Sequence, residues 1–335
     1  MNNKKVAIII VNFNGKEFIK KCLDSVFKQS YTYFDIYFID NGSSDNSIEF
    51  VKKNYSNSKL KIIKLNKNYG FAKGNNIGIK EAFKDKKVKY IVCLNNDTIV
   101  NRNWLKELVK TAEKDKKIGA VGSKIIFLNK KNKINSLGII PLPNGNGINY
   151  GKNQKSILYK KEEIIFGPCA AAALYKREVL EKIGLFDEKY FCYLEDVDLA
   201  YRINLAGYIS VLNPKSWLYH VHSGTSIKMG SFKSYLIIRN SMYNILKYLK
   251  LSYLLIYPYL SYKLYQKIKI RFNIQKKEDE NLKIQFIINV FKSYFSIFSM
   301  ISYFLKERKR IKNYIQVIDA VEKEKIYKKF ILDYK

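Results

Sequence analysis

The residues best suited to chemistry follow short apolar runs. Residues 90–94 form such a run, which ends in Asn95, Asn96 and Asp97. Runs rich in β-branched and aromatic residues predict buried strands, and open α/β sheets bind ligands outside the carboxyl ends of their strands. A carboxylate there suits Mg²⁺ or Mn²⁺ carrying a diphosphate, because these ions share oxygen ligands with substrate phosphates. The alternative is that Asn96 and Asp97 cap a helix that begins near residues 101–104.

A second carboxylate, Asp40, directly follows the predicted strand 35–39 and is expected at the same edge as Asp97. A carboxylate there can accept hydrogen bonds from a nucleoside base or ribose. Residues 68–76 open a predicted helix at this edge, where glycines permit close approach and a helix N-terminus favours anions. Gly/Asn clusters also form ordinary turns. The chain has no G-x-G-x-x-G after its first strand and no Walker A sequence, which argues against dinucleotide and P-loop chemistry.

Three carboxylates, Glu195, Asp196 and Asp198, open another predicted helix. Acidic residues in a first turn are stabilised by the helix dipole, and this stabilisation is sufficient to explain the presence of Glu195 and Asp198. Asp196 lies beside two aromatic residues and Leu194, and we expect partial desolvation to raise its pKa toward that of a general base.

The two histidines, His220 and His222, follow a predicted strand and are the only ones in the chain. A lone histidine is commonly structural. Two within one turn at a strand end favour a metal or phosphate role for one of them.

The elements that must position these residues alternate between strand and helix. Strands are expected at 6–11, 35–39, 61–65, 90–94, 120–127, 166–175, 208–212 and 217–220. Helices are expected at 18–27, 46–54, 72–83, 104–113, from 176 to 183, and 195–205. This alternation predicts an α/β fold with a doubly wound, mostly parallel sheet. Residues 141–151, rich in Gly, Pro and Asn, predict a mobile loop or hairpin over the crevice.

The composition changes near residue 231, so we expect a catalytic domain over 1–230 and a helical region over 231–335. Residues 284–305 approach the ~20 residues that cross a bilayer. Lys292 and several hydroxyls within this stretch favour instead an amphipathic helix in the membrane interface, its lysines toward anionic headgroups. Packing against the catalytic domain or a second subunit is the alternative.

The formal net charge of +32 predicts an anionic partner: a membrane surface, anionic substrates or nucleic acid. Compositional drift toward lysine is the other source of such a charge. The lysines are spread along the chain and no nucleic-acid-binding motif is visible, so nucleic acid ranks last. The 47% hydrophobic content excludes a disordered protein.

The cysteines, Cys22, Cys93, Cys169 and Cys192, form no C-x-x-C pair. We expect reduced core residues, and not a disulfide or zinc framework. The apolar run 6–11 is too short for a signal-peptide core, which predicts a cytoplasmic protein.

The motifs, taken together and in order, resemble family 2 glycosyltransferases, specifically their rhamnosyltransferase-like branch. The resemblance covers residues 5–250 and rests on residues 11–15, 40–45, 68–78, 94–97, 195–199 with Arg202, 220–226 and 239–240. It implies a GT-A fold. It also implies inverting transfer of a sugar from dTDP-rhamnose or a UDP-hexose to a hydroxyl of a cell-surface or lipid-linked glycan.

The resemblance also implies residue roles. Asp196 matches the catalytic base, Asp40 the contact to the nucleoside base, and Asp97 with His220 the ligands of Mg²⁺ or Mn²⁺; His222 ranks second as a ligand. The donor is expected to be bound by Asn12, Asn14, Asp40, Gly70, Gly74, Asn75, Asn95 and Asn96, although Asn95 replaces the first acid of the family's D-x-D motif. Glu195, Asp198 and Arg202 are expected to contact the acceptor or support the site.

The expected enzyme is peripheral on the inner face of the cell membrane and is compatible with an oligomer. The alternative function is that of a basic nucleic-acid-binding protein without catalysis.

Overall fold

The computed structural model describes residues 4–221, 230–263 and 280–315, with the side chains of residues 280–283 and 312–315 excluded. The chain divides into two compact units. The first contains Met1–Ile140 and Asn149–Lys228, and the second contains Pro141–Ile148 and Met229–Lys335. His222 lies outside the described residues, so its predicted secondary role as a ligand stays a prediction.

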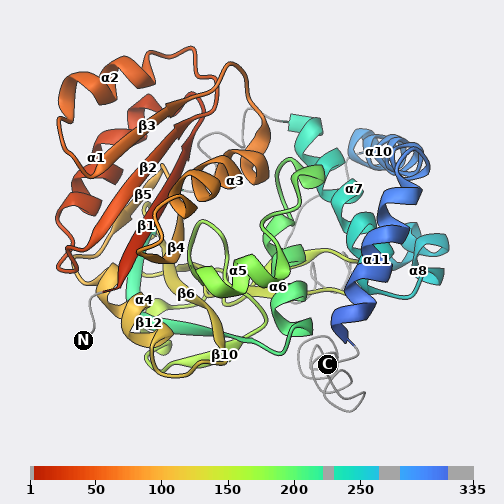
Figure 1. Ribbon diagram of the computed structural model, residues 1–335. Coiled ribbons are helices and arrows are strands. Elements are labelled where there is room, and N and C mark those ends of the chain that lie inside the picture. Colours follow the sequence, from red (N-terminus) through yellow and green to blue (C-terminus); the bar gives the residue numbers. More distant parts are fainter. Residues whose placement is uncertain (1–3, 222–229, 264–279, 316–335) are drawn as a thin grey trace. The chain divides into compact units, whose positions relative to one another are not determined.

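The first unit is built on a ten-stranded sheet (Figure 1). Its strands are β1 (Lys5–Asn12), β2 (Phe34–Asp40), β3 (Leu60–Lys64), β4 (Val88–Asn95), β5 (Thr98–Val100), β6 (Ile118–Phe127), β7 (Ile134–Ser136), β10 (Glu163–Ile165), β11 (Ala172–Lys176) and β12 (Ile209–His220). The strand order is β10-β12-β6-β11-β4-β1-β2-β3, with β5 paired to β12 and β7 paired to β6.

Because β1 pairs in parallel with β2 and β4, the polar carboxyl ends of these three strands lie side by side at one edge of the sheet. Asn12 lies opposite Asp40 on β2, and Val11 lies opposite Asn95 on β4. Pairing is antiparallel between β11 and both β4 and β6, and parallel between β12 and β6. The predicted doubly wound, mostly parallel sheet is therefore confirmed.

The apolar strand runs are buried on both faces, because successive side chains of a strand point to opposite sides of the sheet. In β1, Val6, Ile8 and Ile10 belong to one core cluster, while Ala7 and Ile9 belong to another. Helices α1 (Lys16–Phe27), α2 (Ser47–Asn54) and α4 (Trp104–Ala112) contribute to the first cluster. Helices α3 (Gly70–Phe83), α5 (Arg177–Ile183) and α6 (Glu195–Leu205) contribute to the second. Figure 1 shows α1 and α2 on one side of β1–β3 and α3 on the other.

Three predicted strands differ from the structure. Residues 166–175 do not form one strand, because Gly167 and Pro168 interrupt the apolar run and β11 begins only at Ala172. Residues 208–212 and 217–220 belong to a single strand, β12, whose pairing with β6 shifts register between Asn213 and Trp217. Short 3₁₀ turns occur at Ser156–Leu158 (η1) and Glu188–Tyr190 (η2).

The second unit contains α7 (Gly230–Tyr248), α8 (Ser252–Leu255), α10 (Glu280–Phe298) and α11 (Ile301–Ile315). It also contains most of the hairpin formed by β8 (Ile139–Pro141) and β9 (Gly147–Asn149), so the predicted hairpin is present but groups with the C-terminal helices. The hairpin packs on α7: Asn244 Nδ2 donates to the carbonyl of Gly145 at 2.8 Å. Gly145 has a φ of +78°, and a Cβ there would collide with the carbonyl of Ser241.

All four cysteines are free of disulfides, as predicted. Cys22 and Cys93 are buried, whereas Cys169 and Cys192 are half-buried, and Cys169 packs against the first core cluster. Both of the latter lie in loops next to the site.

Candidate active site

Asp97 and His220 lie together because β5 pairs with the end of β12. His220 lies opposite Thr98, and the backbone N–H of Val221 donates to the carbonyl of Asp97 at 3.0 Å. The Asp97 Oδ1 atom is 3.0 Å from His220 Nε2. Asn96 and Asp97 do not cap the following helix, since α4 begins after Asn103 without a side-chain cap. The capping alternative is thus wrong.

His220 is oriented by Asn135, a residue on β7 that the sequence analysis missed. His220 Nδ1 is 3.1 Å from Asn135 Oδ1. In the tautomer that lets Asn135 Oδ1 accept, Nδ1 carries the proton and donates it. The lone pair of neutral His220 is then on Nε2 and points toward Asp97 Oδ1 and Asn95 Nδ2, the latter at 3.4 Å. Proteins use such a partner on the far nitrogen to fix a metal-binding imidazole.

This pair fits a hard divalent cation. Asp97 Oδ1 is buried and accepts no hydrogen bond, although a buried carboxylate oxygen normally has a partner. A cation bound by this oxygen and by the Nε2 lone pair would satisfy both. Among the residues that the structure describes, no group of three or more His, Cys, Asp or Glu residues could hold a metal. The remaining ligands would be phosphate and water oxygens, as is usual for Mg²⁺.

A hydrogen-bonded network joins the ends of β1, β2 and β4. Asn12 Nδ2 donates to Asp40 Oδ1 at 3.2 Å, and Asn12 Oδ1 accepts from Asn96 Nδ2 at 2.6 Å. Asp40 Oδ2 accepts from the backbone of Ser43 at 3.1 Å, and Asp40 is 1% exposed. Both oxygens of Asp40 are therefore engaged within the protein. In this structure Asp40 organises the loop after β2 and does not present an open carboxylate to a base.

Asn14 reaches the same loop from the other side. Its backbone N–H donates to Ser43 Oγ at 3.0 Å, and its Oδ1 accepts from the backbone of Ser44 at 2.8 Å. Asn14 has a φ of +49°, a conformation that asparagine tolerates better than most residues. Asn14, Ser43 and Ser44 are less buried than Asp40. They are thus the groups of this network nearest to solvent.

The start of α3 is occupied by contacts within the protein. The N–H of Tyr69 donates to Asn41 Oδ1 at 3.0 Å, that of Gly70 to Asn68 Oδ1 at 2.9 Å, and that of Ala72 to the carbonyl of Phe191 at 3.1 Å. These donors are therefore not open to a phosphate, contrary to the expectation for this helix N-terminus.

The predicted donor-binding residues on α3 have packing roles in this structure. Gly70 has a φ of +82°, and a Cβ there would collide with the carbonyl of Phe191. A Cβ on Gly74 would lie 2.9 Å from Val11 Cγ1 on β1. Asn75 Nδ2 donates to the carbonyl of Phe71 in its own helix at 2.9 Å. These contacts fix α3 against β1 and the loop that precedes α6.

That loop is strained. Phe191, Tyr193 and Leu194 all have positive φ, between 63° and 70°. Each non-glycine residue in this region costs on the order of 1–3 kcal/mol, and such strain concentrates at functional sites. The loop leads directly into Glu195 and Asp196 in the first turn of α6.

Asp196 is a carboxylate with a raised pKa. Burial raises its pKa from 3.8 to about 6, against the opposing effect of backbone N–H groups of Ala170 and Val197 that donate to it at 3.2 and 2.9 Å. Burial raises the pKa of Glu195 well above its usual value, and the neighbouring charge of Asp196 raises it further. Burial therefore disfavours the charged form of both carboxylates.

Asp198 and Arg202 support this helix. Arg202 Nη2 and Nε donate to Asp198 Oδ2 at 2.6 and 3.0 Å, and both side chains are buried. Arg202 Nη1 also donates to the carbonyls of Ile183 and Gly184 at the end of α5. The pair ties α6 to α5; its predicted role, to contact the acceptor or support the site, stays a prediction.

The order of these elements agrees with a known family. A family model described as glycosyl transferase family 2 matches residues 7–184, which is more than half of the chain. The chain belongs to glycosyl transferase family 2. The predicted family is thereby confirmed, while the rhamnosyltransferase-like branch stays a prediction. The match includes Asp40 and Asp97, and it ends before Asp196 and His220.

Relatives of this family 2 chain include a poly-beta-1,6-N-acetyl-D-glucosamine synthase of Staphylococcus aureus strain COL. The two are 26% identical over 207 residues, which are 61% of this chain and 46% of the relative. A synthase of the same name from Staphylococcus epidermidis is 25% identical over 211 residues, which are 63% of this chain and 48% of the relative. The chain thus spans about half the length of the curated relatives it matches.

Solved structures show the same fold. The mannosyltransferase PcManGT from Pyrobaculum calidifontis, in complex with GDP-Man and Mn²⁺, has a TM-score of 0.53 and 16% identity, and the alignment covers 92% of this chain and 87% of that one. GalNAc-T7 with UDP, GalNAc and Mn²⁺ has a TM-score of 0.54 and 18% identity, with 73% and 51% covered. The predicted GT-A fold is confirmed.

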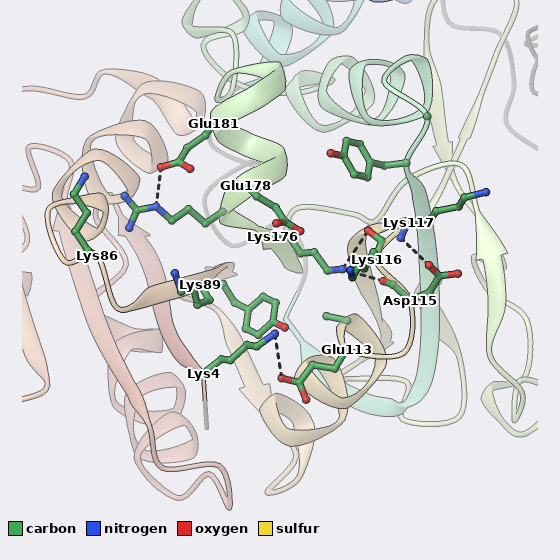
Figure 2. A pocket seen from close by; sticks show the side chains of 15 residues that line it. Lys4, Lys86, Lys89, Glu113, Asp115, Lys116, Lys117, Lys176, Glu178 and Glu181 are labelled. Carbon is green, nitrogen blue, oxygen red and sulfur yellow. Dashed lines mark hydrogen bonds and ion pairs between the residues drawn. The ribbon is translucent and has the colours of Figure 1, made fainter. Parts of the chain in front are cut away.

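A hollow of about 1060 Å³ in this family 2 chain lies at the opposite, amino-terminal end of β4 (Figure 2). None of the predicted site residues lines it. Several of its charges are paired: Lys4 with Glu113 at 3.8 Å and Arg177 with Glu181 at 2.8 Å, while Lys176 donates to the carbonyl of Asp115 at 2.9 Å. It is a groove of mixed charge, remote from the carboxyl-end groups.

Proposed function

We propose that this protein transfers a sugar, with inversion, from a nucleoside diphosphate sugar to a hydroxyl of a glycan or lipid-linked acceptor. One observation carries the proposal: the two residues that would bind a cation, Asp97 and His220, and the carboxylate that would act as the base, Asp196, are linked through adjacent stretches of backbone. The N–H of Asn95, two residues before Asp97, donates to the carbonyl of Ala171 at 2.9 Å, and the N–H of neighbouring Ala170 donates to Asp196.

Asp196 is proposed as the general base. Inversion by a single displacement requires a base on the acceptor hydroxyl, on the face opposite the departing diphosphate. A carboxylate with a pKa of about 6 is charged at neutral pH and is a stronger base than an ordinary aspartate. The Asp198–Arg202 pair holds the helix that carries Asp196.

Asp97 and His220 would hold Mg²⁺ or Mn²⁺, which offsets the charge that develops on the leaving diphosphate. Asn135 holds His220 with its Nε2 lone pair toward Asp97. The Mn²⁺ in both solved relatives supports this assignment. Asn12, Asn14, Asn95 and Asn96 frame the donor side of the site through the network that joins the strand ends.

For the donor we propose dTDP-rhamnose or a UDP-hexose, in line with the resemblance to the rhamnosyltransferase-like branch. A relative that is named a polysaccharide synthase supports a glycan acceptor. We place the enzyme in the cytoplasm, at the inner face of the cell membrane, where lipid-linked acceptors are present.

The test is binding and slow hydrolysis of a panel of UDP-, dTDP- and GDP-sugars by the purified protein, with Mn²⁺, Mg²⁺ or EDTA. We expect one donor to be selected and its hydrolysis to require metal. If no donor binds and the protein instead binds nucleic acid tightly in low salt, the proposal is wrong.

A further inference from the structure

Helix α10 in the second unit has two apolar faces. One face packs on α7: Val290, Ser293 and Ile297 are buried, and Ser296 Oγ lies 2.8 Å from Tyr243 Oη on α7. The other face is exposed although its side chains are large and hydrophobic. A helix of a water-soluble domain normally presents polar residues on its outer face.

The exposed face is a continuous stripe. Phe291, Phe295 and Phe298 are 70%, 78% and 79% exposed. The stripe, called here the α10 stripe, consists of Ile284, Ile287, Ile288, Phe291, Phe295 and Phe298. These residues recur at intervals of three and four, which places them on one side of a helix. The α10 stripe continues toward α8, because Tyr294 donates to the carbonyl of Leu254, next to the exposed Leu255.

Clusters of exposed apolar side chains mark binding surfaces. Three occupants can cover this one: the interior of a bilayer, a second copy of the chain, or the interface of a membrane. In the part of the chain that the structure describes, no single helix is long and apolar enough to cross a membrane. Ile284–Phe298 and Ile301–Ile311 pass that test only as a pair, and they are bent by 73°.

The packing of α10 on α7 also opposes a bilayer crossing, because one side of α10 carries buried polar groups such as Asn289 and Ser293. The α10 stripe covers only the other side. Such a helix suits the interface plane, with one face in the acyl chains and the other on protein.

The charge around the α10 stripe favours an anionic membrane over a second copy of the chain as the partner that covers it. Segment 284–311 contains a single acidic residue, Glu307, and five basic ones, Lys292, Lys306, Arg308, Lys309 and Arg310, and segment 231–263 contains no acidic residue. With a net charge of +32, two copies meeting through this region repel one another. Anionic lipid headgroups attract it.

We propose that the α10 stripe inserts into the interface of an anionic membrane, with the exposed lysines Lys292, Lys306 and Lys309 on the headgroups. This assignment does not depend on the transfer reaction. Vesicle binding and donor binding are separate measurements, so one can fail while the other holds.

The experiment is cosedimentation of the full chain with vesicles of phosphatidylglycerol and phosphatidylcholine. We expect binding to vesicles rich in phosphatidylglycerol, and a loss of about tenfold or more in partitioning for the double variant Phe295→Asp/Phe298→Asp. The matched control is Ile157→Asp/Leu158→Asp, because these side chains are 68% and 67% exposed in the first unit. The control should bind as the wild type does, and circular dichroism should show both variants folded.

Four results would overturn the proposal or its anionic part. The first is equal vesicle binding by the wild type and the Phe295/Phe298 variant, and the second is no binding by the wild type. The third is a concentration-dependent dimer, without lipid, that the same variant converts to monomer, which would assign the stripe to a second copy. Equal affinity for phosphatidylcholine alone would refute the anionic part.

Discussion

The two units differ in which side chains they bury: the first buries polar ones and the second leaves large apolar ones exposed. In the first unit, buried polar side chains are hydrogen-bonded in pairs: Asn12 donates to Asp40 at the carboxyl end of the sheet, and Arg202 donates to Asp198 on α6. In the second unit, large apolar side chains such as Phe295 face outward. Buried polar networks fix geometry, because a partly satisfied network is costly. The first pattern is suited to positioning a reaction, and the second to attaching the protein to an apolar phase.

The comparison predicts its largest effect at Asp196, whose raised pKa depends on burial. Asp196→Asn removes the proposed base but keeps the size of the side chain. Turnover should fall by roughly 10²-fold or more, with donor affinity nearly unchanged. Steady-state kinetics and calorimetric titration of the donor measure the two quantities.

The control for Asp196 is Asp115→Asn, at the exposed opposite end of the sheet, which should keep normal turnover. Near-normal turnover of the Asp196 variant would remove Asp196 from the role of base.

Attachment of the second unit is the next effect in size. The loss of about tenfold or more in partitioning expected for Phe295→Asp/Phe298→Asp should leave hydrolysis of the soluble donor unchanged. Hydrolysis assays without vesicles check this separation. A parallel loss of hydrolysis would show that the two regions do not have separate tasks.

The pH dependence tests the Asp196 carboxylate itself. The base must be deprotonated, and burial raises its pKa to about 6. We therefore expect kcat/KM, at saturating metal, to fall about tenfold for each pH unit below about 6. An ordinary exposed aspartate would place this decline near pH 4. A profile that stays flat down to pH 5 would contradict the assignment.

Substitution of Asn135 is expected to have a similar or smaller effect, on Mn²⁺ affinity, because Asn135 acts through His220. Asn135→Ala should weaken Mn²⁺ binding by about tenfold, the lower end of the range for partners of metal-bound histidines. Asn135→Asp should restore binding, since a carboxylate accepts the same Nδ1 proton. Titration with Mn²⁺ alone, followed by electron paramagnetic resonance, is independent of turnover. The exposed Asn54→Ala is the control, and unchanged affinity in Asn135→Ala would show that Asn135 does not orient a ligand.

Local patterns predicted most of the fold but only part of the site. The alternating core of β1 and the first turn of α6 are encoded in neighbouring residues, so the strand, the helix and the grouping of Glu195 with Asp196 were predictable. The pairing of Asp97 with His220 depends on β5 reaching β12, and the sequence indicated it only through a family resemblance.

The missed features depend on contacts between distant segments. Asn135 lies on a three-residue strand, too short to give a periodic signal, and its role depends on β7 and β12 flanking β6. The contacts of Asp40 and Gly70 were not predictable for a similar reason: their neighbours, Asn12 and Phe191, come from other segments. In each case the residue type indicated a special position, but the sequence did not reveal which distant residue it contacts.

The measurement that tests the central claim most directly is calorimetric binding of the selected donor to the wild type and to Asp97→Ala, with Mn²⁺ and with EDTA. We predict that wild-type binding requires Mn²⁺ and that the variant loses affinity for Mn²⁺ and donor together. Identical donor binding with Mn²⁺ and EDTA, or identical binding by the two proteins, would contradict a metal-assisted site at Asp97 and His220.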